Sequence, residues 1–339
     1  GEVPQRGGEG DFYPLSHFVT APPEWEPRGT DCDRRESPEG VTSAAGLLAK
    51  TISIQVRRIL KKVIKTFPSF CDTMSQKEGI CMKKCLCVLL VLALLAGLGL
   101  TVGRTPIYNL YREIEYRRST PTEAEQTVHA YAGAHKIPYG SYPKDLIELL
   151  GINPETRDFV LNYPTRKEIP VDLSGYSRET VPLFLQWDPM WGYEKYGSGC
   201  IGQTGCGPTC LAMVGYYLTG EESFNPKDVA AFSGENGYYA SGYGSSWTLI
   251  SEGGVKLGLK VQELPLVKGK MTAAVEAGHP VILALGKGDF TSSGHYIVLT
   301  GWNGEAFRVN DPNSPIRSGR LWSYEELEPQ IRNIWELSV

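Results

Sequence analysis

The stretch "QTGCGPTCLAMV", which begins at Gln203, contains a residue that can do chemistry. Cys206 lies between two glycines, and Pro208 follows two residues later. Proline is tolerated only in the first turn of a helix, so Cys206 lies at or just before the start of a helix. The unpaired N–H groups and the helix dipole at that end favour a negatively charged thiolate. We therefore predict that Cys206 is a nucleophile.

The neighbouring cysteines offer other uses for this thiol. Cys210 lies one helical turn further on, where Cβ atoms are ~5–6 Å apart, and a disulfide needs roughly 3.5–4.5 Å. A bridge between Cys200 and Cys206 stays an alternative. No second CxxC-like pair accompanies these cysteines, which argues against a structural zinc site. We expect no metal and no organic cofactor.

A nucleophilic cysteine needs a base and a group that orients the base. Of the five histidines, His295 starts the apolar run "HYIVLTGW", directly after a loop of small residues. The run "AFRVND" follows and ends at Asp311, with Gly304 between the two runs. If Gly304 marks a hairpin turn, His295 and Asp311 lie near the same end of two adjacent strands. A carboxylate there can hold the imidazole in one tautomer.

Helices are predicted mainly in the first half of the domain that positions these residues, and strands mainly in its second half. Helical patterns cover residues 206–218, 225–232 and 245–258, and a capping box starts a late helix at 323–326. Strand patterns cover residues 181–187, 259–266, 279–286, 295–302 and 306–311. This distribution predicts an α+β domain with an antiparallel sheet.

Four motifs in this order, "QWDPMWGY", "GCGPTCLAMV", "GHYIVLTGW" and "VNDPN", resemble a known family. The family is the papain-like cysteine peptidases related to bacteriocin-processing (double-glycine) peptidases, cysteine peptidase family thirty-nine, and in particular its stand-alone branch in Gram-positive bacteria. The resemblance covers about residues 182–337 and implies a papain-like fold, with N-terminal helices packed on an antiparallel sheet. It implies Cys206 as nucleophile, His295 as general base and Asp311 as the orienting acid.

The resemblance also implies a glutamine that donates a hydrogen bond to the oxyanion. Transporter-linked members place this glutamine six residues before the cysteine, a position that Cys200 occupies here. Gln186 and Gln203 are the two substitutes. We predict Gln186, because the end of a strand holds a side chain rigidly, whereas Gln203 lies in a Gly-rich turn very close to the nucleophile.

Residues 85–103, "CLCVLLVLALLAGLGLTVG", form an uncharged apolar run of about transmembrane length. Basic residues dominate before it, so the positive-inside rule places everything after Arg104 outside the cell. Residues 82–103 have the shape of a signal sequence without an obvious cleavage site. We expect a single-pass anchor in the cell membrane; if the signal is cleaved, the protein is secreted. We also expect translation to start at Met74 or Met82.

Four parts of the chain follow from these patterns. We expect residues 1–81 to be a disordered and basic N-terminal region, which we interpret as an extension upstream of the natural translation start. Residues 82–103 are the predicted signal anchor or transmembrane helix. Residues 104–180 are a small helical spacer and linker, in which Asn153 caps a helix that begins at Pro154. Residues 181–339 are the papain-like peptidase domain.

The composition limits the partners. A formal net charge of −4 argues against nucleic acid as a partner, because phosphate binding needs a basic surface. We predict a membrane-tethered or secreted cysteine peptidase that hydrolyses peptide bonds in peptides or proteins. One alternative keeps the thioester chemistry but acts as an acyl transferase, transpeptidase or cell-wall amidase. Another is a non-catalytic peptide-binding module with the same fold.

Overall fold

A computed structural model of the protein describes residues 108–241 and 244–339. The described chain divides into two compact units, residues 108–151 and residues 152–339. The predicted membrane segment at 85–103 and the basic region before it lie outside the described residues. Within the described ranges, no helix is long and apolar enough to cross a membrane.

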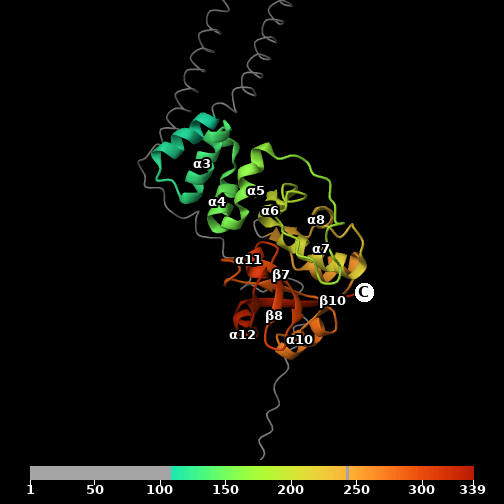
Figure 1. The fold of residues 1–339 in the computed structure, drawn as a ribbon. Coiled ribbons are helices and arrows are strands. Elements are labelled where there is room, and N and C mark those ends of the chain that lie inside the picture. Colours follow the sequence, from blue (N-terminus) through green and yellow to red (C-terminus); the bar gives the residue numbers. More distant parts are fainter. Residues whose placement is uncertain (1–107, 242–243) are drawn as a thin grey trace, which may run out of the picture. The chain divides into compact units, whose positions relative to one another are not determined.

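The unit of residues 108–151 is helical (Figure 1). A helix over residues 108–118 is followed by α3 (Glu123–His135), the 3-10 turn η1 (Tyr139–Ser141) and α4 (Lys144–Ile152). Thr122 and Glu125 form a capping box that starts α3. The core of this unit is made by apolar side chains that are fully or nearly buried, namely Val128, Ala132, Tyr142, Leu146, Ile147 and Leu150.

The second unit begins with short helices. η2 (Pro154–Thr156), α5 (Arg157–Asn162) and η3 (Tyr163–Thr165) follow one another directly. Asn153 caps η2 by accepting a hydrogen bond from the backbone N–H of Glu155, and Pro154 is the first helical residue, as the sequence predicts. The first turn is 3-10 rather than α-helical.

The helices around the predicted nucleophile come next. After the short strands β1 (Lys195–Tyr196) and β2 (Gly199–Cys200) lie α6 (Ile201–Thr204), α7 (Cys206–Thr219) and α8 (Pro226–Glu235). The second small hairpin pairs β3 (Tyr239–Ala240) with β4 (Gly244–Ser245). A π-helical turn, η4 (Leu249–Gly253), continues into α9 (Gly254–Lys256). The predicted helices at 206–218 and 225–232 are therefore confirmed.

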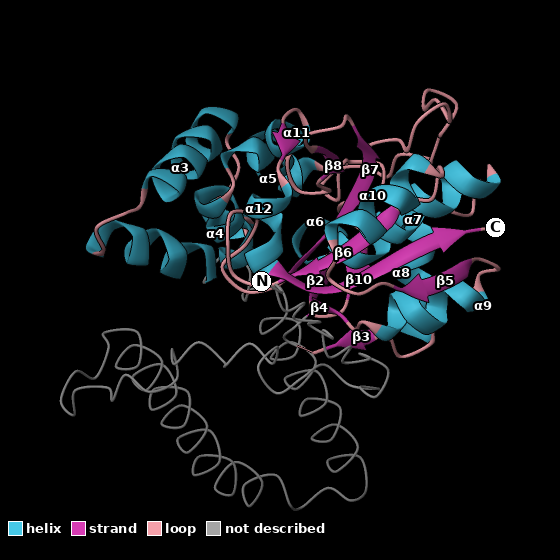
Figure 2. Ribbon diagram, turned by 90° about the horizontal axis from the view of Figure 1, so that it is seen from below, coloured by secondary structure: helices cyan, strands magenta, loops and turns pink. Residues whose placement is uncertain are grey.

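The sheet has six strands in the order β5-β10-β6-β7-β8-β9, and all neighbouring pairs are antiparallel (Figure 2). The strands are β5 (Lys260–Glu263), β6 (Val281–Leu285), β7 (His295–Trp302), β8 (Phe307–Asn310), β9 (Leu321–Trp322) and β10 (Ile331–Ser338). The connections contain α10 (Lys268–Glu276), α11 (Pro315–Ser318), α12 (Tyr324–Leu327) and η5 (Glu328–Gln330). The prediction of a mixed fold with an antiparallel sheet is confirmed.

Helices cover both faces of the sheet. All five residues of β6 are buried, and successive side chains point to opposite faces. Ile282 and Ala284 belong to the apolar cluster that contains the α7 residues, whereas Val281, Leu283 and Leu285 belong to the cluster that contains the α10 residues. This two-sided burial fixes the register of the strand that pairs with β7, because a slip by one residue would exchange the two faces.

The turn between β7 and β8 is the one that the sequence predicts. Gly304 has a φ of +96°, which a residue with a side chain rarely adopts. The paired residues Trp302 and Phe307 close the hairpin around it. The prediction of adjacent strands at 295–302 and 306–311 is confirmed. The start of β7 and the end of β8 therefore lie at the same end of the hairpin.

Several elements differ from the sequence-based expectation. The predicted strand at 181–187 is wrong, because this segment pairs with no strand; the Asn310 side chain binds its carbonyls at Val181 and Pro182. The helix α10 and the strand β10 are among the elements that the sequence analysis did not predict. The segment at 245–258 is helical only over residues 249–256: Ser245 belongs to β4, and the helix begins as a π-helical turn at Leu249.

Candidate active site

Cys206 is the first residue of α7. α6 ends at Thr204, and Gly205 alone separates the two helices. The next ten residues of α7, Gly207–Tyr216, are all buried, whereas Cys206 itself is half-buried. The thiol therefore lies where the helix dipole favours negative charge and where a substrate can still reach it.

The backbone next to Cys206 is closely covered by β4. A Cβ atom at Gly207 would lie 2.6 Å from the Ser245 Oγ atom, closer than side chains pack. The Ser245 hydroxyl also contacts the Tyr196 hydroxyl at 2.7 Å, and its carbonyl accepts a hydrogen bond from Tyr296. These contacts fix the wall beside Cys206, and they explain why a glycine follows the cysteine.

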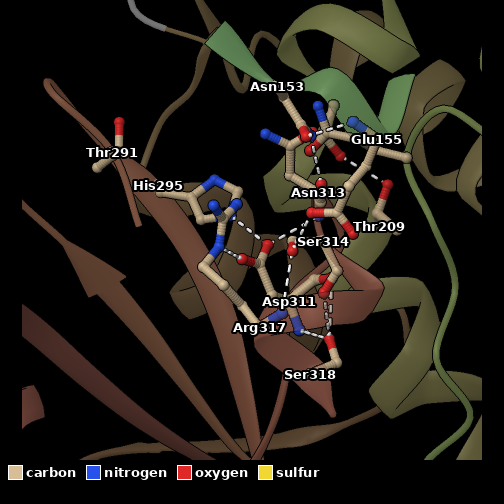
Figure 3. Close-up of polar contacts among 12 residues, drawn as sticks. Asn153, Glu155, Thr209, Thr291, His295, Asp311, Asn313, Ser314, Arg317 and Ser318 are labelled. Carbon is tan, nitrogen blue, oxygen red and sulfur yellow. Dashed lines mark hydrogen bonds and ion pairs between the residues drawn. The ribbon is translucent and has the colours of Figure 1, made fainter. Parts of the chain in front are cut away.

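His295 and Asp311 lie where the hairpin brings them together. His295 is the first residue of β7, and Asp311 directly follows β8. Both side chains are buried, and His295 Nε2 lies 2.7 Å from Asp311 Oδ1 (Figure 3). A carboxylate only accepts hydrogen bonds, so Nε2 carries a proton in this arrangement. Nδ1 is then the ring nitrogen that is left for Cys206.

The charges of the two residues depend on each other. Burial lowers the pKa of His295, but the charge and hydrogen bond of Asp311, together with those of Cys206, outweigh burial and raise the pKa to about 10. Burial raises the pKa of Asp311, but the neighbouring His295 and Arg317 hold it below its usual value. The His295 imidazole is therefore an imidazolium at neutral pH.

Arg317 is a site residue that the sequence analysis missed. Its Nε donates to the second carboxylate oxygen, Asp311 Oδ2. Asp311 Oδ1 also accepts from the backbone N–H of Asn313 at 2.8 Å, and the backbone N–H of Asp311 donates to the Ser318 hydroxyl at 2.8 Å. The Asp311 carboxylate thus lies between His295 and Arg317. Both the side chain and the backbone of Asp311 are hydrogen-bonded to the loop that follows β8 (Figure 3).

Gln186, the predicted oxyanion donor, is buried close to both halves of the site. Its side-chain Nε2 donates to the Gly202 carbonyl in α6 at 2.9 Å, and its backbone N–H donates to the Pro312 carbonyl at 2.7 Å. Its Oε1 has no partner among the residues that the structure describes. Gln186 therefore links the helix before Cys206 to the residue after Asp311, although no strand holds it.

Gln203, the alternative donor, is engaged with a different residue. Its Oε1 accepts from the backbone N–H of Cys200 at 3.2 Å, and the Cys200 thiol lies 3.3 Å from the same oxygen.

Burial raises the pKa of Cys200 to about 11, and burial raises the pKa of Cys210 well above its usual value. Cys200, Cys206 and Cys210 are all free thiols. Only Cys206 among the three is not buried.

The other histidines lie elsewhere. His129 and His135 belong to the unit of residues 108–151, and His17 lies outside the described residues. His279 is paired with Glu336, with 2.6 Å between Nδ1 and Oε1. Across residues 108–241 and 244–339, no three His, Cys, Asp or Glu side chains are placed to hold one metal ion.

The family of this part of the chain follows from a comparison with protein families. Residues 178–338 match the model of the Peptidase_C39 like family. This match supports a C39-like, papain-like domain over these residues. The C39-like domain thus contains all four predicted site residues, whereas η2, α5 and η3 precede it.

Two solved structures are similar to the chain. One is the peptidase domain of Streptococcus ComA, a bifunctional ABC transporter involved in a quorum-sensing pathway; the identity is 19%, with 43% of this chain and 98% of that chain covered and a TM-score of 0.33. The other is a Bacillus anthracis protein described as a C39-like peptidase; the identity is 15%, with 48% and 96% covered and a TM-score of 0.32. No curated protein matches the chain.

Proposed function

We propose that the C39-like domain is a cysteine peptidase that hydrolyses peptide bonds with Cys206, His295 and Asp311. The observation that carries the proposal is the buried hydrogen bond between His295 Nε2 and Asp311 Oδ1 at 2.7 Å, beside a half-buried cysteine at a helix start. This arrangement supplies a nucleophile, a base and a group that fixes the tautomer of the base. A peptide-binding module without catalysis does not need the raised pKa of His295.

The reaction follows from these roles. The Cys206 thiolate attacks the substrate carbonyl, an S–C bond forms, and the carbonyl oxygen becomes an oxyanion. The C–N bond then breaks while the His295 imidazolium gives its Nδ1 proton to the leaving amine. A water molecule, which loses a proton to the neutral imidazole, attacks the thioester and releases the acid and the thiolate.

Two donors can stabilise the oxyanion. One is the backbone N–H of Cys206 at the start of α7. The other is the side-chain amide of Gln186, which has two N–H groups, and only one of them is required for the bond to Gly202. The second N–H is available for a substrate oxygen. Gln203 is the less suitable donor because its amide is oriented by Cys200.

Peptide cleavage by the full chain tests this function. The purified protein is incubated with a diverse peptide mixture, with and without an added amine, and products are identified by mass. We expect products that contain an added water; products that contain the amine would instead indicate acyl transfer. Cys206→Ala should abolish both kinds of product, and Cys200→Ser is the matched control, which should keep the activity. Full activity in Cys206→Ala would refute the proposal.

Thiol labelling gives an independent test of the nucleophile. We expect iodoacetamide at neutral pH to modify Cys206 much faster than Cys200 or Cys210, because the latter two are buried and have raised pKa values. Peptide mapping after a short reaction measures the three rates. Equal labelling of the three thiols would contradict a special reactivity of Cys206.

The proposed location is the outer face of the cell membrane, with residues 85–103 as the anchor. The support is the apolar run itself and the excess of basic residues before it. Protease added to intact cells should then degrade the domain, and release of a soluble domain into the medium would instead indicate cleavage of the signal. Protection of the domain until the cells are lysed would overturn this orientation.

A further inference from the structure

The loop that follows Asp311 is held by a segment that lies before the C39-like domain. The domain begins at residue 178, whereas the holding residues, Asn153 and Glu155, belong to η2 and its cap. Both residues belong to the same compact unit as Asp311. Figure 3 shows them above the loop, with Asn313 and Ser314 between them and Asp311.

Asn153 fixes the first part of this loop. The residue is only 5% exposed. Its Nδ2 donates to the Asn313 carbonyl at 2.6 Å and lies 3.1 Å from Asn313 Oδ1. The backbone N–H of Asn313 in turn donates to Asp311 Oδ1 at 2.8 Å. One residue therefore separates the Asn153 side chain from the carboxylate that holds His295.

Glu155 fixes the second part of the loop. One of its carboxylate oxygens accepts from the Ser314 hydroxyl, and the other accepts from the backbone N–H of Ile316 at 3.1 Å. The Ser314 hydroxyl oxygen accepts from the backbone N–H of Arg317 at 3.0 Å and thereby caps α11. Hydrogen bonds to a charged acceptor are roughly twice as strong as those between neutral groups. Glu155 thus anchors both the cap and the first turn of α11.

The helix α11 carries the groups that position Asp311. Arg317 Nε donates to Asp311 Oδ2, and Ser318 Oγ accepts from the backbone N–H of Asp311. A continuous chain of hydrogen bonds therefore runs from Glu155 through Ser314 and Arg317 to Asp311, and from there to His295.

We propose that Glu155 and Asn153 are positioning residues of the active site, which set the place of Asp311, and through it of His295, from outside the C39-like domain. The effect of these two residues on catalysis rests on the proposed function. Its effect on the His295–Asp311 pair is a property of the folded protein and is measurable without a substrate.

The groups that would respond are few. The charged and titratable groups that face His295 are Asp311 and Cys206, and those that face Asp311 are His295 and Arg317. When the loop loses its anchor, the contact between Asp311 and His295 is less well populated. The His295 titration midpoint then falls, and the imidazolium that faces Cys206 is less populated.

Three variants of the full chain separate positioning from general stability. Glu155→Ala removes both hydrogen bonds, and Glu155→Gln keeps an acceptor but removes the charge. Asp158→Asn is the matched control: it removes a charge from the same segment, but this side chain is exposed and only approaches Arg157, at 3.9 Å. Each variant is assayed well below its thermal midpoint, so that all measurements report on folded protein.

Four quantities are measured for each variant: the titration midpoint of His295 by NMR of the ring nitrogens, the rate of Cys206 alkylation by iodoacetamide at pH 7, and kcat and KM for a peptide. We expect a lower midpoint and slower alkylation in Glu155→Ala, smaller changes in Glu155→Gln and none in Asp158→Asn. A displacement of about 1 Å can cost on the order of 100-fold in rate, so kcat should fall by about 10- to 100-fold with little change in KM.

The outcomes distinguish this proposal from the proposed function. If Glu155→Ala and Glu155→Gln lower only the thermal midpoint, and the His295 midpoint, the alkylation rate and kcat stay at wild-type values, the positioning role is refuted. If no peptide is cleaved by the wild-type protein but the His295 midpoint still follows Glu155, the positioning role stands and the peptidase function fails. If Glu155→Ala does not fold, Glu155→Gln decides.

Discussion

Replacement of Asp311 by Asn tests the charge arrangement around His295 most directly. Asn has the shape of Asp, but its amide offers one acceptor oxygen where the carboxylate offers two. Asp311 Oδ1 accepts from His295 and Oδ2 accepts from Arg317. In Asp311→Asn, when the amide oxygen accepts from His295, the amide NH₂ group faces Arg317 Nε–H. Two donors then face each other. The variant therefore loses the negative charge and also leaves a buried donor without an acceptor.

The size of the effect follows from the pKa of His295. Burial lowers this pKa, and Asp311 contributes most to raising it from 6.5 to about 10. The whole shift corresponds to roughly 5 kcal/mol in favour of the imidazolium. Without the Asp311 charge, burial holds the pKa near or below 6.5. At pH 7.5 a pKa of 6.5 leaves about one tenth of the imidazole protonated, so kcat/KM should fall by about 10-fold or more.

The same shift predicts how stability depends on pH. In the wild-type protein, His295 keeps its proton when folded and loses it when unfolded between pH 6.5 and about 10. Its contribution to the free energy of unfolding is therefore complete below pH 6.5 and is lost as the pH rises to about 10. Asp311→Asn should remove this part of the pH dependence.

The assay has three parts: kcat/KM against pH with a cleaved peptide, the His295 titration by NMR, and thermal unfolding at several pH values. We expect the variant to fold and to show a lower His295 midpoint together with the loss of activity. A variant that keeps wild-type kcat/KM at pH 7.5 and an unshifted His295 midpoint would refute the reasoning.

The remaining predictions concern neighbouring residues. Gln186→Ala should lower kcat by on the order of 10²–10³-fold, with little change in KM or in alkylation of Cys206; a null effect there, with a large one in Gln203→Ala, would transfer the oxyanion role to Gln203. Asn310→Ala removes an amide that donates to two backbone carbonyls at 181–182, so urea denaturation should show a loss of about 1–3 kcal/mol with kcat little changed. A loss of kcat in Asn310→Ala that exceeds the loss in Asp311→Ala, with both variants folded, would contradict Asp311 as the orienting acid.

The parts of the site that local sequence rules determine could be predicted. Pro208 places the start of a helix at Cys206, and Gly304 places a turn between two strands. The turn at Gly304 is enough to put His295 and Asp311 near the same end of two adjacent strands. The packing of the apolar helix α7 on the sheet then brings these two residues close to Cys206.

Other elements have weak local patterns for physical reasons. β10 lies inside the sheet between β5 and β6, and its register shifts between Ile331 and Asn333. Such a bulge interrupts the alternation by which strands are recognised. α10 starts without a side-chain cap, so it lacks the usual mark of a helix start. The segment 181–187 has the composition of a strand, but side chains and loops, rather than a neighbouring strand, satisfy its backbone.

The support of Asp311 could not be predicted, because it joins residues that are far apart in the chain. Glu155 and Ser314 are 159 positions apart, and no spacing rule connects them. Arg317 follows Asp311 by six positions but contacts it only because α11 turns the chain back. These contacts are visible only when the fold is known.

The position of β10 has a consequence for the order in which the domain is assembled during synthesis. Residues 331–338 pair with β6 on one side and with β5 on the other, so the sheet is not continuous until they are present. Cys206, His295 and Asp311 all leave the ribosome earlier than this strand. Pairings between distant residues form slowly, because the loops between them must close first. A nascent chain therefore carries Cys206, His295 and Asp311 before the sheet that positions the last two is complete.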